Sequence, residues 1–149
     1  MRPSLSSDVI FLDTSFVYAL ADEGDPNHER AKELFRQALE SDEDLLTHNY
    51  ILVESVALLQ SRLRLDQALR FLRESEDFHI HWVTPQDHRQ GVNLLKERGR
   101  RGLSLVDCVS FVVMRRHRVR EALAFDPDFE REGFKLYKGR TKDALENRQ

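Results

Sequence analysis

Short apolar runs typical of buried strands alternate with longer amphipathic segments along most of this chain. The predicted strands are residues 9–12, 45–47, 78–83, 122–125 and 134–137. The predicted helices are residues 16–21, 49–62, 65–74, 85–99 and 103–114, with another that opens at Asp25-Pro26. This alternation predicts an α/β fold, with a parallel sheet of about five strands and helices on both faces.

Length and composition fit one domain that needs no covalent cross-links. The chain has 149 residues, a net charge of −3 and one cysteine, Cys108. We predict a domain at residues 8–137 and a charged C-terminal tail at 138–149. A lone thiol favours a reducing, cytoplasmic setting, with Cys108 as a buried apolar side chain. Residues 9–21 include an aspartate and are too few to span a bilayer, so no membrane segment is expected.

Four carboxylates stand in unusually apolar surroundings: Asp13, Glu54, Asp107 and Asp126. Each of the first three is the only Asp, Glu, Lys, Arg or His in a stretch of 13 residues, and the fourth closes an apolar strand. Burial of a carboxylate is costly unless a positive charge compensates it, and no basic residue is placed by the sequence to pair with these four. A divalent cation is the simplest compensating charge.

The predicted topology brings the carboxylates together. Asp13 and Asp126 end strands, and sites in open parallel sheets form outside the carboxyl ends of strands, where the strand order reverses. Ser104 and Asp107 lie three residues apart, so they share one side of their helix. An all-oxygen ligand set suits Mg²⁺ or Mn²⁺ rather than Zn²⁺, and such ions can activate a water against a phosphodiester.

Each carboxylate also has a structural interpretation. Asp13 could be a helix cap, and Glu54 could lie on the exposed edge of an amphipathic helix. Asp107 could be a partly exposed helix residue, and Asp126 could belong to a turn before Pro127. The four carboxylates therefore indicate a site only when they are taken together.

Four segments resemble a known family in their order and spacing. They are VIFLDTS at residues 9–15, THNYILVE at 47–54, LSLVDCVSF at 103–111 and ALAFDPDF at 122–129, the last followed by Gly133-Phe134. Together they resemble the PIN-domain nucleases, especially the VapC-type toxins of bacterial and archaeal toxin–antitoxin pairs. The resemblance covers nearly the whole chain.

This resemblance implies a three-layer α/β/α fold in which the four isolated carboxylates are catalytic, metal-binding acids. It implies that Ser15 and Ser104 are supporting hydroxyls, and that Asp128 is an outer group beside the fourth acid. It further implies RNA cleavage by metal-activated water with Mg²⁺ or Mn²⁺, often by a homodimer, and inhibition by a small antitoxin protein.

Arginines flank the helix that carries Asp107. Arg98, Arg100 and Arg101 precede this helix, and Arg116 follows it. A nuclease holds a polyanion beside an acidic pocket and needs cations nearby, so these arginines are candidate RNA contacts. Solvated arginines at helix ends are an equally open interpretation.

Other functions remain open from the sequence. An aspartyl-phosphate phosphatase of the haloacid dehalogenase type would have a second aspartate where Ser15 stands. A non-catalytic RNA-binding PIN protein would usually have lost an acid, and a housekeeping RNA-processing nuclease would keep all four. His79 and His81 share a face of a predicted strand without a further ligand pair, so zinc is not expected.

Overall fold

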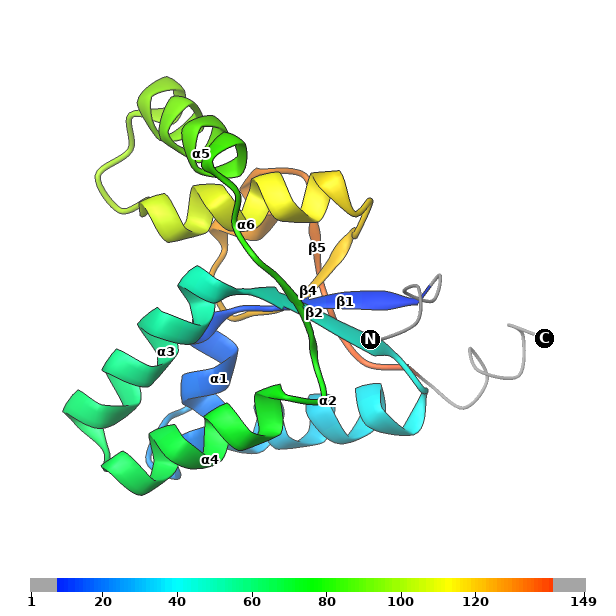
Figure 1. The fold of residues 1–149 in the computed structure, drawn as a ribbon. Helices are drawn as coiled ribbons and strands as arrows, with labels where there is room; N and C mark the ends of the chain where they lie inside the picture. The colour runs from blue at the N-terminus through cyan, green and yellow to red at the C-terminus, as the bar shows by residue number, and fades with distance from the viewer. Residues whose placement is uncertain (1–7, 141–149) are drawn as a thin grey trace.

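The computed structural model describes residues 8–140 and contains a five-stranded sheet whose neighbouring strands are all parallel (Figure 1). The strands are β1 (Val9–Leu12), β2 (Asp44–His48), β3 (His79–His81), β4 (Glu121–Leu123) and β5 (Lys135–Leu136). The helices are α1 (Thr14–Ala21), α2 (His28–Glu40), α3 (Asn49–Arg62), α4 (Leu65–Ser75), α5 (Pro85–Arg98), α6 (Leu105–Arg116) and α7 (Asp128–Arg131). The predicted α/β class and parallel five-stranded sheet are confirmed.

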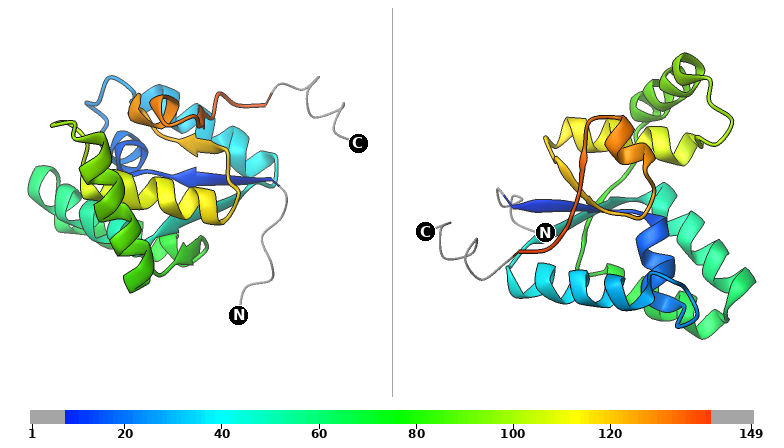
Figure 2. Two further views of the ribbon diagram at one scale, coloured as in Figure 1. Left: turned by 90° about the horizontal axis from the view of Figure 1, so that it is seen from above. Right: turned by 180° about the vertical axis from the view of Figure 1, so that it is seen from behind.

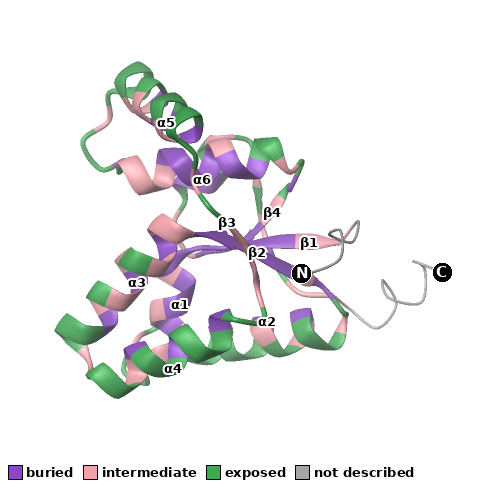
Figure 3. Cartoon of the chain, viewed as in Figure 1, coloured by how far each residue is buried: buried purple, intermediate pink, exposed green. Residues whose placement is uncertain are grey.

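Two hydrophobic cores lie on opposite faces of the sheet. Along β1, Ile10 and Leu12 belong to the core formed with α1, α2 and α4, whereas Phe11 belongs to the core formed with α5 and α6. Figures 1 and 2 show these helix groups on either side of the sheet, and Figure 3 shows buried residues along the strands and the inner helix faces. Helix α3 reaches both cores, through Ile51 and Leu59. The three-layer arrangement is therefore confirmed.

The strand order, β3-β2-β1-β4-β5, reverses at the centre of the sheet. From β1 the chain builds outward through β2 to β3, and then returns to place β4 on the other side of β1. The amide of Asp13 donates to the carbonyl of Leu123 at 3.1 Å, so the two central strands end side by side. A crevice for a ligand is expected at this edge of a parallel sheet.

The boundaries of several elements differ from the prediction. Helix α2 starts at His28, because Asp25 accepts a bond from the amide of Asn27 at 2.8 Å and the chain makes a turn before the helix. Strand β3 is shorter than predicted, since β2 ends at His48 and offers no backbone for pairing with residues 82–83. Strands β4 and β5 are shorter too, and helix α7 has only one turn, too short for a periodic signal.

The C-terminal end of the described chain is anchored to the sheet edge. Arg140 lies 2.7 Å from Glu121 and 3.3 Å from Glu43. The predicted tail at 138–149 thus makes ordered contacts where it begins, and residues 141–149 lie outside the described part. Among residues 8–140, no helix combines the length and apolar character needed to cross a membrane.

Helices α5 and α6 approach each other closely at Gly91. A Cβ at this position would lie 2.7 Å from the Cγ2 of buried Val109. A Gly91→Ala variant should therefore lower the free energy of unfolding by about 1 kcal/mol, since overpacking costs about 1–3 kcal/mol and Ala gains about 1 kcal/mol in helix propensity. Urea denaturation measures this loss. Gly102→Ala is the control, because its Cβ would meet no atom within 4 Å, and equal stability of the two variants would contradict the prediction.

Candidate active site

Asp13 follows β1 and caps the start of α1. Its Oδ2 accepts hydrogen bonds from the amide of Ser15 at 3.1 Å and from the Ser15 hydroxyl at 2.6 Å. The same hydroxyl accepts a bond from the amide of Phe125 at 3.0 Å, just beyond β4. Ser15 therefore joins the first acid to the segment that carries the fourth. Asp13 is a helix cap, which is the structural role considered for it in the sequence. It is also buried, with only 4% of its surface exposed.

Asp107 lies in the first turn of α6 within a reciprocal cap. The Ser104 hydroxyl accepts from the Asp107 amide at 3.0 Å, and Asp107 Oδ2 accepts from the Ser104 amide at 3.1 Å. This capping box fixes the carboxylate at the helix N-terminus, where the helix dipole favours negative charge. Cys108, the next residue, is buried as predicted.

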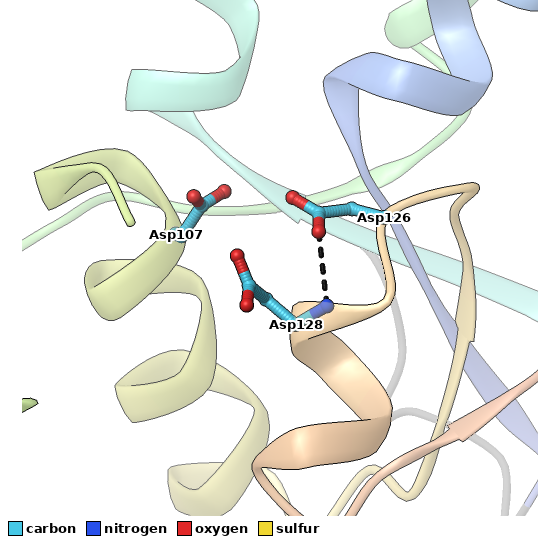
Figure 4. A group of neighbouring side chains, drawn as sticks. All are labelled: Asp107, Asp126 and Asp128. Atoms are coloured by element: carbon cyan, nitrogen blue, oxygen red, sulfur yellow. Dashed lines mark hydrogen bonds between the residues drawn. The ribbon is translucent and has the colours of Figure 1, made fainter. Parts of the chain in front are cut away.

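The loop between β4 and α7 brings two further carboxylates to Asp107. Asp126 Oδ1 accepts a bond from the Asp128 amide at 2.9 Å, which fixes the turn. Asp107, Asp126 and Asp128 each offer a carboxylate oxygen within 4.8 Å of the others (Figure 4). The structure thus joins two predicted metal ligands with the predicted outer group.

The pKa values of the acids relate Asp13 and Glu54 to Asp107. Burial raises the pKa of Asp13 to about 7, the Ser15 hydroxyl opposes the rise, and the charges of Asp107 and Glu54 add to it. Burial also raises the pKa of Asp107, with contributions from Asp126 and Glu54. A carboxylate that raises the pKa of another lies near it, so Asp13, Glu54 and Asp107 border one region, although Asp13 and Glu54 are not in the three-residue cluster.

Among residues 8–140, no Lys, Arg or His forms an ion pair with any of the four predicted metal ligands. Asp128 differs, because its Oδ1 lies 3.0 Å from Arg100 and 2.8 Å from Arg131. Its charge is already compensated by protein. Uncompensated carboxylates, with oxygen as the only donor, fit a hard divalent ion such as Mg²⁺ or Mn²⁺.

Three of the four predicted RNA-binding arginines already pair with carboxylates. Arg98 lies 2.6 Å from Glu132, and Arg100 contacts Asp128 beside the acids. Arg116 lies 2.6 Å from buried Asp87, at the end of α6 away from the capping box. Arg101 is exposed near the acidic end. Position therefore favours Arg100 and Arg101 over Arg116 as phosphate contacts, whereas Arg98 shares Glu132 with Arg115 in the last turn of α6.

A polar network between β3, α5 and the C-terminal end of α6 was not predicted from the sequence. His81 Nε2 lies 2.7 Å from Asp87 Oδ2, and His81 Nδ1 lies 2.9 Å from the Nε2 of His117. The sequence offered one partial signal, since Thr84 and Asp87 have capping-box spacing and form that box. The contact with His117 spans 36 residues and has no local signal.

Comparisons with known proteins agree with this geometry. The PIN domain family model matches residues 10–135. The chain is 36% identical over 128 residues to the 23S rRNA-specific endonuclease VapC20 of Mycobacterium tuberculosis, a match that covers 85% of this chain and 95% of that protein.

Two solved structures share this fold. The crystal structure of M. tuberculosis VapC20, described as a sarcin–ricin loop cleaving toxin, matches with a TM-score of 0.74 and 34% identity, over 84% of this chain and 95% of that one. VapBC2 from Rickettsia felis, bound to a DNA fragment from their promoter, matches with a TM-score of 0.59 and 11% identity, over 86% and 96% of the two chains. The second match supports the fold alone. With a family model spanning most of its length and a relative above one-third identity, this chain belongs to the PIN domain family.

Proposed function

We propose that this chain is a metal-dependent endoribonuclease that acts as the toxin of a toxin–antitoxin pair. The observation that carries the proposal is the convergence of carboxylates without cationic partners at the carboxyl edge of the sheet. The family membership supports a nuclease, and it leaves no place for the haloacid dehalogenase alternative.

In this proposal Asp13, Glu54, Asp107 and Asp126 hold Mg²⁺ or Mn²⁺. The ion would act as a Lewis acid toward the phosphodiester and would lower the pKa of a bound water. The chain itself orients the acids, since Ser15 fixes Asp13 and the capping box fixes Asp107. Preset ligand positions matter because a misplacement of about 1 Å can cost about 10²-fold in rate.

Asp128 and the arginines before α6 have supporting roles in this proposal. The Asp128 amide holds Asp126, while the Asp128 carboxylate holds Arg100 beside the acids. Arg100 and Arg101 would contact phosphates that flank the scissile bond. These cations offset the repulsion between the acidic pocket and an anionic substrate.

The relatives suggest the substrate and the partners. VapC20 is named for cleavage of 23S rRNA, and its relation to this chain supports ribosomal RNA as the substrate class here. A small antitoxin protein, a homodimer and a cytoplasmic location belong to the same proposal. A housekeeping RNA-processing role and a non-catalytic RNA-binding role are the alternatives.

The test uses purified protein, intact ribosomes, naked 23S rRNA and an unrelated structured RNA. Each substrate is incubated with Mg²⁺, with Mn²⁺ or with EDTA, and cleavage is mapped by primer extension. We expect a discrete cut in 23S rRNA that requires metal. Cleavage of every RNA at many positions would favour a different role within the family, and absence of cleavage in all conditions would favour the RNA-binding role.

A further inference from the structure

His48 is a buried polar residue that joins two acid-bearing helices. It ends β2, is 0% exposed and caps α3, the helix that carries Glu54. Its Nε2 lies 2.8 Å from the hydroxyl oxygen of Ser110, which is one turn beyond Asp107 on α6. Within residues 8–140, this is the one side-chain hydrogen bond between the start of α3 and α6. The site's second and third acids are therefore connected through this contact.

The hydrogen bonds define which ring nitrogen of His48 carries the proton. Nδ1 faces the amide of Ile51 at 3.4 Å and so must accept. The Ser110 hydroxyl donates to the carbonyl of Val106 at 2.9 Å, so its oxygen must accept from His48 Nε2–H. Burial lowers the pKa of His48 to about 3, which keeps the ring neutral at neutral pH. One tautomer thus satisfies every partner.

A simpler residue would be enough to cap α3. Asn, Ser or Thr can accept from a first-turn amide, but none of them reaches from the end of β2 to α6 while it caps. The imidazole has its acceptor and donor on opposite sides of a rigid ring, so it sets the separation between the two helices. Outer groups that orient metal ligands commonly change metal affinity by about 10–100-fold when removed.

We propose that His48, through its bond to Ser110, is a positioning residue that sets the spacing of Glu54 and Asp107 for metal binding. The proposal rests on the proposed metal-dependent function, since it concerns the ligands of that site. It adds a determinant that lies outside the acids and does not touch the substrate. A buried histidine with a structural role alone would contribute to stability and leave metal affinity unchanged.

The test compares metal affinity with stability in variants that remove the bond from either side. His48→Asn keeps an acceptor for the cap and loses the donor to α6, whereas Ser110→Ala removes the acceptor. Tyr50→Phe is the matched control, because Tyr50 lies on α3 and its hydroxyl bonds to His88 on α5 at 2.7 Å, a helix without an acid of the site. Calorimetric titration with Mn²⁺ alone measures affinity, and thermal melts measure stability.

We expect His48→Asn and Ser110→Ala each to raise the Mn²⁺ dissociation constant about 10-fold, and Tyr50→Phe to leave it unchanged. The double variant should bind Mn²⁺ no more weakly than either single variant, because the two single variants and the double variant all lack the same hydrogen bond. If His48→Asn does not fold, Ser110→Ala alone tests the effect on metal affinity. A ¹⁵N NMR spectrum of the unaltered protein then tests whether His48 is protonated at Nε2.

Two results would overturn the proposal, and they are distinct. Wild-type Mn²⁺ affinity in both variants, with stability losses like that of Tyr50→Phe, would make His48 a structural residue and leave the metal site intact. No Mn²⁺ binding by the unaltered protein would contradict the proposed function itself, and the positioning role would fall with it.

Discussion

An Asp107→Asn variant should fold like the unaltered protein and cleave RNA at least about 10²–10³-fold more slowly, the loss typical of removing one preorganised electrostatic group. The amide oxygen of Asn can still accept from the Ser104 amide, so the start of α6 is retained. The negative charge that would help hold the metal ion is lost. Single-turnover cleavage with saturating Mg²⁺ measures the effect, and circular dichroism checks the fold.

Asp128→Asn is the matched control for this prediction. It removes a carboxylate from the same cluster, but one whose charge is already balanced by Arg100 and Arg131. A smaller loss is expected for it than for Asp107→Asn. Equal activity of the Asp107→Asn variant and the unaltered protein would remove Asp107 from the catalytic site.

An Asp13→Asn variant should be more stable than the unaltered protein when metal is removed with EDTA. The pKa of Asp13 rises from 3.8 to about 7 in the folded state, chiefly by burial. Ionised Asp13 therefore opposes folding, by about 4 kcal/mol above pH 7, at about 1.4 kcal/mol for each unit of pKa. Both hydrogen bonds from Ser15 reach the same oxygen, which Asn can retain.

The pH dependence gives this prediction its sign. A raised pKa means that the folded state binds the proton more tightly, so the unfavourable contribution of Asp13 to stability is absent below pH 3.8 and grows until the pH reaches about 7. The two proteins should have similar melting temperatures at low pH and differ by about 10 °C at pH 8. Added Mn²⁺ should narrow the difference, because it compensates the carboxylate of the unaltered protein. A variant less stable at pH 8 in EDTA would contradict the account.

The sequence predicted an element well where its periodic segment is long or where a capping box marks its start. Helix α3 begins and ends at the predicted residues, and α5 begins at Pro85 within the Thr84–Asp87 capping box. Short elements were less predictable, because one turn of α7 has no period and the length of β3 depends on where β2 ends. Capping chemistry therefore located the start of α5 but not that of α2, where Asp25-Pro26 forms a turn before the helix. Strand lengths depend on neighbours in the sheet.

The site also has parts that the sequence could predict and parts that it could not. The acids could be singled out because each stands in apolar sequence, where a charge needs a tertiary reason. The pairing of Asp128 with Arg100 and the bond from His48 to Ser110 could not, since they join residues 28 and 62 positions apart. Their residue types have ordinary surface or capping roles, and only the packing of α6 against its neighbours gives them partners. The roles of the site residues remain predictions until the variants are measured.

The reversal of strand order at the sheet centre has a consequence for when such an enzyme can first act. Strand β1 is made first, yet its second neighbour, β4, is made more than 100 residues later, together with the last of the four acids. A nascent chain that has not yet released β4 from the ribosome has an unfinished central ladder and an incomplete set of acids. The central ladder and the set of acids therefore become complete together, and only after β4 has left the ribosome.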